Sequence, residues 1–186
     1  MTLVAPTYTD LTGTYTLDPA HTRIGFVARH AMVTKVRGAF NDFEGTIRVD
    51  GAVPAQSSAK VVIKAASIDT RNAQRDEHIR SADFLELETY PEITFVSTEV
   101  RRTGDSTFEV TGDLTVKDVT KPVTVEFEYE GTATDPFGNV RIGFEGSVTI
   151  SRKDFGITWN AALETGGVLV SDKIVLEFEV SAIKAA

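Results

Sequence analysis

The chain has 186 residues and a mass of 20.2 kDa, which fits one domain with a sizeable core. Its 19 Lys and Arg against 27 Asp and Glu give a net charge of −8, which argues against binding nucleic acid through a basic surface. Cysteine is absent, which excludes disulfides, thiolate catalysis and cysteine-based metal sites.

The first residues of the chain resemble no secretory signal. Residues 1–6 have no charged segment and no apolar run of signal-peptide length. No stretch approaches the roughly 18 apolar residues that span a bilayer. We therefore expect a cytoplasmic location. Residues 1–13 lack clear alternation and are expected to form an N-terminal arm, followed by a single domain over residues 14–186.

Two-residue alternation of apolar and polar side chains dominates the chain and predicts amphipathic strands. The apolar sets, in chain order, are Ile24, Phe26 and Ala28; Ile47 and Val49; Ala59, Val61 and Ile63; Ile93 and Phe95; Phe108, Val110, Leu114 and Val116; Val123, Val125, Phe127 and Tyr129; Val140, Ile142, Phe144, Val148 and Ile150; Ile174, Leu176, Phe178 and Val180. Strands with one wet face are typical of antiparallel sheets. The pattern predicts an all-β protein, an antiparallel β-barrel of about eight strands.

Residues 69–91 form the one long stretch without alternation. A short helix is expected over residues 72–80, capped by Asp69 or Thr70, within a helical insertion around residues 70–85. Pro91 is expected to end this insertion before the next strand. Such an insertion serves either as a functional lid or as a plug for one barrel end, and the sequence leaves both open.

A barrel of about eight strands holds either packed side chains or one small ligand. Five phenylalanines lie on alternating apolar faces, and small residues share those faces. They favour an apolar internal space, while a packed core stays the alternative. The aromatic residues are Phe26, Phe95, Phe127, Phe144 and Phe178, and the small ones are Ala28, Gly112 and Gly146.

Motifs for catalysis, phosphate loops, dinucleotide binding or calcium binding are missing. The spacing of His21, His30 and His78 does not suit a metal centre. His30 shares the apolar face of Phe26 and is either a core histidine or a ligand for a polar head group. His21 is expected to bond to Asp18, and His78 to be solvated. We expect no enzyme activity, no cofactor and no metal.

Several linked motifs resemble those of the YceI-like family, over about residues 15–183. They are YTLDPAHT at residues 15–22, followed by IGF at 24–26 and His30; GAFNDFEG at 38–45; IDT at 68–70; RDEHIRSADF at 75–84; YPEITF at 90–95; GDLTV at 112–116; VTKPV at 119–123; and RKDFG at 152–156. One departure is Asp118, where relatives usually have glycine in the turn.

The resemblance implies a lipocalin-like barrel, commonly a homodimer, whose lumen holds a long polyisoprenoid lipid of the polyprenyl phosphate or quinone type. Family members are also associated with isoprenoid transport and stress responses. The wall of the lipid site would be formed by Phe26, Phe40, Phe43, Phe84, Leu85, Phe95, Phe127, Phe144 and Trp159, and the head-group site by His30, Arg152 and Asp154. Arg75 and Arg80 would act at the gate, while the inward aliphatic side chains would be structural.

The leading hypothesis is thus a binding or carrier protein for an isoprenoid lipid, with no nucleic acid or metal as partner. One alternative is an enzyme for an apolar substrate, with His30 or the pair Asp76 and Glu77 as acid and base, although adjacent helical residues point apart. The other is a structural stress-response protein with a packed barrel.

Overall fold

The computed structural model describes residues 7–164 and 166–186. Its strands are β1 (Gly13–Leu17), β2 (Arg23–His30), β3 (Thr34–Phe40), β4 (Phe43–Val49), β5 (Ser58–Lys64), β6 (Ile68–Asp69), β7 (Glu92–Arg102), β8 (Thr107–Val116), β9 (Val119–Thr134), β10 (Val140–Ser151) and β11 (Lys173–Lys184). One α-helix, α1 (Ala73–Arg80), and four short 3-10 helices, η1 (Thr9–Leu11), η2 (Pro54–Gln56), η3 (Ala65–Ser67) and η4 (Arg152–Phe155), complete these residues.

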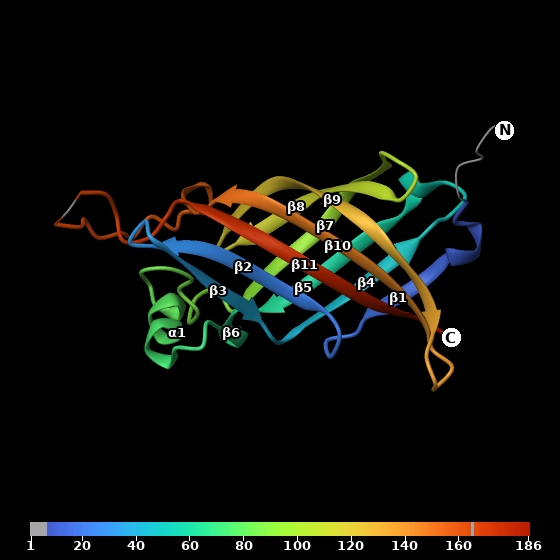
Figure 1. Cartoon of the computed structure of the whole chain (residues 1–186), viewed down its shortest axis with the longest axis horizontal. Coiled ribbons are helices and arrows are strands. Elements are labelled where there is room, and N and C mark those ends of the chain that lie inside the picture. The colour runs from blue at the N-terminus through green and yellow to red at the C-terminus, as the bar shows by residue number, and fades with distance from the viewer. Residues whose placement is uncertain (1–6, 165) are drawn as a thin grey trace.

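Eight of the strands close into an antiparallel barrel, as the alternation predicted. They follow the order β1-β4-β5-β7-β8-β9-β10-β11, and β1 pairs back to β11 to close the ring. Neighbouring strands pair antiparallel, and the register shifts at Thr98 in β7 and at Glu130 in β9, each of which is an extra residue opposite the partner strand. Such bulges let a long sheet bend enough to close. Figure 1 shows the long strands wrapping around a common axis.

Strand β11 pairs with β10 along one edge and with two strands, β2 and β1, along the other edge. Its first half pairs with β2, from Val175↔Val27 to Glu179↔Arg23, and its last residues pair with β1. Hairpin β2–β3 therefore extends the barrel wall beyond β1 at one end, and the two-residue strand β6 pairs with the end of β3. The short β1 and longer β2 together fill the place of one strand beside β11.

The helical insertion lies at one end of the barrel, which we call the helix end (Figure 1). Helix α1 begins after Asn72, whose side chain accepts from the backbone N–H of Arg75 at 3.0 Å, so the cap is Asn72 rather than Asp69 or Thr70. The guanidinium of Arg80 donates to the carbonyl oxygens of Ala66 and Ile68. These bonds fix the insertion to the segment between β5 and β6.

The opposite end of the barrel, which we call the arm end, is covered by the described part of the predicted N-terminal arm. The Tyr8 ring packs edge-on against Phe108 and Tyr129, with ring centroids 5.6 and 5.2 Å apart, and the Arg102 guanidinium lies 4.9 Å from its centroid. Residues 1–6 lie outside the described residues. The arm therefore contacts the barrel from Tyr8 onwards.

An ionic cluster ties the turn before β2 to the β9–β10 turn at the arm end. Asp18 accepts from Arg141 at 2.5 Å and binds the His21 ring at 2.7 Å, which confirms the expected Asp18–His21 bond. Arg141 also donates to Asp135 at 2.8 Å. Hydrogen bonds from Arg141 and then His21 lower the pKa of Asp18. Burial raises the pKa of Asp135, but bonds from Asn139, Arg141 and Phe137 outweigh it and hold that pKa at about 2.

The ionic cluster is expected to lose its stabilising effect in acid. Both carboxylates have a folded pKa below the usual value near 3.9, so their contribution is complete above roughly pH 5 and is lost as the pH falls towards 2. The Arg141→Gln variant should melt below the wild type near neutral pH, and the two melting curves should converge as the pH falls. A gap between the melting temperatures that persists unchanged at pH 2 would contradict this expectation.

Candidate ligand-binding cavity

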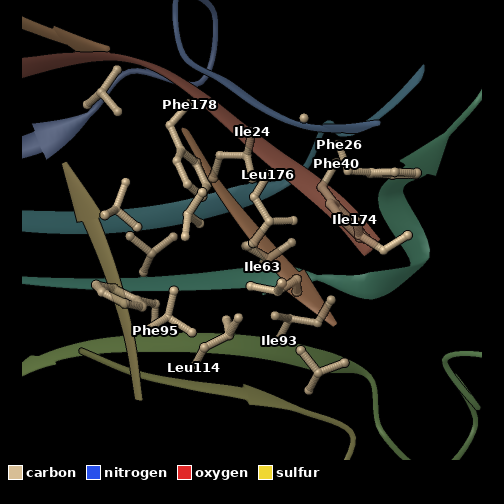
Figure 2. A pocket seen from close by; sticks show the side chains of 18 of the residues that line it. Ile24, Phe26, Phe40, Ile63, Ile93, Phe95, Leu114, Ile174, Leu176 and Phe178 are labelled. Atoms are coloured by element: carbon tan, nitrogen blue, oxygen red, sulfur yellow. The ribbon is translucent and has the colours of Figure 1, made fainter. Parts of the chain in front are cut away.

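The barrel encloses one large cavity with a volume of about 790 Å³, rather than a packed core. In Figure 2, side chains from opposite walls point into this space: Ile24 from β2, Leu176 from β11 and Ile63 from β5. Ligand pockets in proteins span roughly 300–1,000 Å³, so the volume is that of a ligand site. The alternative of a solid barrel does not describe this structure.

Alternation along the strands decides which side chains line the cavity. In β11, Ile174, Leu176 and Phe178 face inward, while Lys173 and Glu179 do not reach the lining. The same parity brings in the aliphatic side chains of the other strands, which the sequence had suggested were only structural. They include Ile24, Val36, Ile47, Val49, Val61, Ile63, Ile93, Val100, Val110, Leu114, Val116, Val123, Val125, Val148 and Ile150. The cavity wall is therefore both aliphatic and aromatic.

Three inward glycines each lie beneath a phenylalanine ring. A Cβ atom added to Gly38 would come within 2.4 Å of the Phe26 ring, and one added to Gly112 within 2.4 Å of the Phe95 ring. The Phe127 ring lies in the same way over its cross-strand partner Gly146. Because the glycines have no side chain, the rings lie along the wall and the lumen stays open.

Ten of the twelve residues proposed for the site from the sequence line the cavity. They are Phe26, His30, Phe40, Phe84, Leu85, Phe95, Phe127, Phe144, Arg152 and Trp159. Phe43 does not: it is the first residue of β4, is 5% exposed and packs in the hydrophobic core, although its cross-strand partner Ile63 lines the cavity. Asp154 is exposed in η4 and does not reach the cavity. Contact with a ligand stays a prediction for the ten.

Polar side chains gather at the helix end of the cavity. Its lining there includes Asn72, Gln74, Arg75 and His78, together with His30. The Arg75 guanidinium is half-buried and donates to Thr70 through Nε at 2.8 Å and Nη2 at 2.6 Å. Neither bond uses Nη1. Arg80, the second gate candidate, is outside the lining because its guanidinium is bound to backbone carbonyls. Polar residues also line the arm end, among them Tyr8, Asp50, Ser57 and Ser58, so the helix end is distinguished by its Arg and His side chains rather than by polarity alone.

His78 is a lining residue that the sequence did not indicate. Its ring is half-buried and lies edge-on to Phe84 and Trp159, with centroids 5.0 and 4.7 Å away, and Nε2 lies 2.9 Å from the Asp83 carboxylate. The three rings join the insertion to residues 156–164 and 166–172, which we call the mouth loop. Charged neighbours in the sequence suggested a solvated histidine, and only the folded insertion brings it against the aromatic rings.

Arg152 holds the mouth loop rather than offering its charge to the cavity. Its side chain is 4% exposed and donates to the carbonyl oxygens of Ser171 at 2.8 Å, Ile157 at 2.9 Å and Trp159 at 2.9 Å, with a longer bond to Val170 at 3.3 Å. Burial lowers the pKa of this guanidinium. The geometry therefore shows a structural clamp where the sequence suggested a head-group ligand.

The remaining chemistry of the cavity is sparse. The Asp76 carboxylate is 7% exposed and accepts from the backbone N–H and the hydroxyl of Thr70, while Glu77 is exposed. Across residues 7–164 and 166–186, no cluster of three or more His, Asp or Glu is placed to hold a metal ion. No helix among these residues is long and apolar enough to cross a membrane.

Comparison with known proteins gives the same grouping as the sequence motifs. The model of the YceI-like domain matches residues 15–182. A UPF0312 protein of Azotobacter vinelandii is 44% identical over 137 residues, which cover 74% of this chain and 71% of that protein. A UPF0312 protein of Pseudomonas aeruginosa is 46% identical over 137 residues, with the same coverage of 74% and 71%.

Solved structures share the barrel. Campylobacter jejuni YceI protein has a TM-score of 0.73 at 33% identity, covering 91% of this chain and 97% of that one. Burkholderia cenocepacia BcnA has a TM-score of 0.78 at 27% identity, covering 89% and 98%. A polyisoprenoid binding domain from Saccharophagus degradans has the same fold, with a TM-score of 0.71 at 16% identity and coverage of 92% and 98%. With its motifs, its closed barrel and its domain match in agreement, the chain belongs to the YceI-like family.

Proposed function

We propose that this protein binds one long apolar lipid of the polyisoprenoid type inside the barrel and acts as its carrier. The observation that supports this most is the 790 Å³ cavity, whose lining residues run from Tyr8 and Leu11 at the arm end to Trp159 and Arg75 at the helix end. A chain-like ligand suits a cavity that extends along the barrel. The polyisoprenoid binding domain of Saccharophagus degradans shares this fold, which makes that class of lipid the first to test.

Burial of hydrocarbon would supply the affinity. Each methylene removed from water contributes about 0.8 kcal/mol, so a five-carbon isoprene unit adds several kcal/mol while room remains. The wall offers mainly side chains such as Leu176, Ile63 and Phe178, which make few demands on the exact position of the tail. We expect affinity to rise with the number of isoprene units and to level off once the cavity is full.

The helix end of the cavity, with its Arg and His side chains, would orient the lipid. Arg75, with His78, Asn72 and Gln74 nearby, can bind an anionic or hydrogen-bonding head group while the tail lies towards the arm end. Binding rather than catalysis fits the other titratable groups, because Asp76 is bonded to Thr70 and Glu77 faces solvent. A cytoplasmic location, a homodimer and a stress-related role stay predictions from the sequence.

The direct test is mass spectrometry of an organic extract from protein purified without detergent. A prenyl lipid in a constant molar ratio to protein is the expected result. If none is found, the protein is incubated with prenyl phosphates and prenylated quinones, and extracted again after removal of free lipid. An empty cavity after both steps would overturn the proposed function.

The Arg75→Gln variant is expected to lose affinity for a prenyl phosphate by roughly 10-fold or more, because a charge-assisted hydrogen bond contributes about 1.5–3 kcal/mol. Its affinity for the uncharged prenol of equal length should stay near that of the wild type. Titration calorimetry with both lipids measures the difference. Arg71→Gln is the matched control, since Arg71 is exposed on the same insertion and outside the cavity lining. Equal losses for the two lipids would exclude a head-group contact by Arg75.

A further inference from the structure

Exposed apolar side chains gather at the helix end, on two adjacent tips. Met32 and Val33 in the β2–β3 turn are 62% and 76% exposed, and Val168 in the mouth loop is 40% exposed. They are three of the six large hydrophobic residues that are exposed in the described part of the chain. We propose that these tips dock the protein on a lipid bilayer that contains anionic lipids.

The two tips form one surface. The backbone N–H of Ala31 donates to the carbonyl oxygen of Leu169 at 2.7 Å, and Ala162 pairs with Val168 within the mouth loop. A Cβ atom added to Gly167 would lie 2.2 Å from the sulfur of Met32, so the methionine rests directly against the mouth loop. In Figure 1 the turn and the mouth loop both lie at the helix end, and the mouth loop extends further from the barrel. The contact of Met32 with the loop makes them one continuous surface.

The backbone of the turn keeps an apolar residue exposed against local preference. Ala31 and Met32 both have positive φ values, 50° and 61°, and the N–H of Val33 donates to the carbonyl oxygen of His30 at 3.0 Å. Because His30 pairs with Thr34, the loop has three residues, and Ala31 and Met32 are the central residues of the β-turn from His30 to Val33. Glycine and asparagine are favoured where φ is positive, and other side chains there cost free energy. No packing in the barrel core explains an exposed methionine at this point. Insertion into the interfacial region of a bilayer would explain it.

The charged residues next to the tips favour an anionic bilayer as the partner. Lys35 and Arg37 lie on the outer face of β3, and the cross-strand partner of Lys35 is Arg29, which is exposed and is also among the residues that line the cavity. All three are exposed, and none forms an ion pair with a described residue. The exposed acids at this end are Glu164 in the mouth loop and Glu77, Asp83 and Glu88 in the insertion, so the cationic patch is confined to the β2–β3 hairpin. A cationic patch on a chain of net charge −8 favours an anionic bilayer over a neutral apolar partner.

The docking surface adjoins the helix end of the cavity. His30 pairs with Val170 and both line the cavity, only a few residues from Met32 and Val168. The use of this position for lipid transfer rests on the proposed function, but docking itself does not. A protein held at these tips would have its cavity end facing the bilayer surface.

Flotation with vesicles tests the proposal on the full chain. The vesicles are phosphatidylcholine alone, or phosphatidylcholine with one third phosphatidylglycerol, and neither contains a prenyl lipid. We expect binding to the anionic vesicles that weakens as salt is raised. The variant Met32→Gly/Val33→Ser should lose at least roughly 10-fold in vesicle affinity. Its melting temperature should be at or above that of the wild type, because glycine accepts a φ of 61°.

Matched variants distinguish the contribution of the tips to vesicle binding from the effect of a similar substitution elsewhere on the surface. Lys35→Gln/Arg37→Gln should weaken anionic binding by roughly 25-fold, at about fivefold per cation. Arg48→Gln/Lys60→Gln makes the same charge change on β4 and β5, and Phe137→Ser removes an 88% exposed ring at the arm end. Both controls should bind as the wild type does.

Several results would overturn membrane docking. One is that the wild type binds neither kind of vesicle. Another is that Met32→Gly/Val33→Ser and Lys35→Gln/Arg37→Gln bind anionic vesicles as well as the wild type does. A third is a dimer, seen by light scattering, that depends on the tips and forms without any vesicle binding. A prenyl lipid in the cavity with no vesicle binding would remove docking and leave the proposed function in place. Tip-dependent vesicle binding with an empty cavity would do the reverse.

Discussion

The Leu176→Trp variant is expected to lose binding of long isoprenoid lipids while keeping the fold. Leu176 lies mid-strand in β11 and points into the lumen, across from Ile63 (Figure 2). An indole there occupies space that the tail would cross. Excluding one five-carbon unit is enough for a loss of at least roughly 10-fold, at about 0.8 kcal/mol per methylene. Because the new ring enters open space rather than packed core, melting should change little. Lipid stoichiometry by mass spectrometry and affinity by calorimetry measure the result.

Val175→Trp supplies the matched control for the lumen. Val175 is the neighbour of Leu176 on the same strand, pairs with Val27 and Thr149, and does not line the cavity. The added ring faces away from the lumen, so lipid binding should remain as in the wild type. Normal long-chain binding by Leu176→Trp would show that the tail does not pass through the middle of the barrel.

Replacing Arg152 by methionine is expected to destabilise the protein by about 3–5 kcal/mol, since buried carbonyl groups lose a charged donor and few have another partner. The melting temperature should fall by about 10 °C for a chain of this size. The four carbonyls belong to the mouth loop, so the loop should open first. Trp159 is the only tryptophan in the chain, and its fluorescence therefore reports on that loop alone.

Two further variants distinguish the clamp from a simple charge effect. Lys153→Met removes an exposed neighbouring charge and should leave stability almost unchanged. Arg152→Lys keeps the charge but cannot reach several carbonyls in different directions, so it should recover only part of the loss. Full recovery by lysine would mean that charge, rather than the forked geometry of the guanidinium, holds the mouth loop.

Local patterns in the sequence predicted the barrel and much of its inner wall. Alternation depends only on neighbouring residues, so it correctly separates Leu176 from Val175 and places Phe95 and Phe127 inward. It says which face is internal, but not how far apart opposite walls stand. That distance depends on strand number and on details such as Phe26 lying over Gly38. The open lumen therefore became visible only in three dimensions.

The polar parts of the site were harder to predict for the same reason. Asp154 and Arg152 are close in sequence, yet Asp154 faces solvent and Arg152 is buried. Arg152 donates to carbonyl oxygens of residues up to 19 positions further along the chain. His78 gains its aromatic neighbours from the fold of the insertion and the mouth loop. The bond between Asp18 and His21 depends on one turn and was predicted correctly. The helix cap is also local, but the prediction placed it at Asp69 or Thr70 rather than at Asn72, because all three residue types can cap a helix.

The position of β11 between β10, β2 and β1 has a consequence for how the protein folds. Tyr15 pairs with Lys184, so the ring closes between strands at the two ends of the chain. Contacts of such long sequence separation carry a high loop-closure cost and slow folding. During synthesis, β1, β2 and β10 keep open edges until β11 leaves the ribosome. The barrel can therefore form only after β11 has been synthesised, and until then its apolar inner face is open to aggregation or to a chaperone.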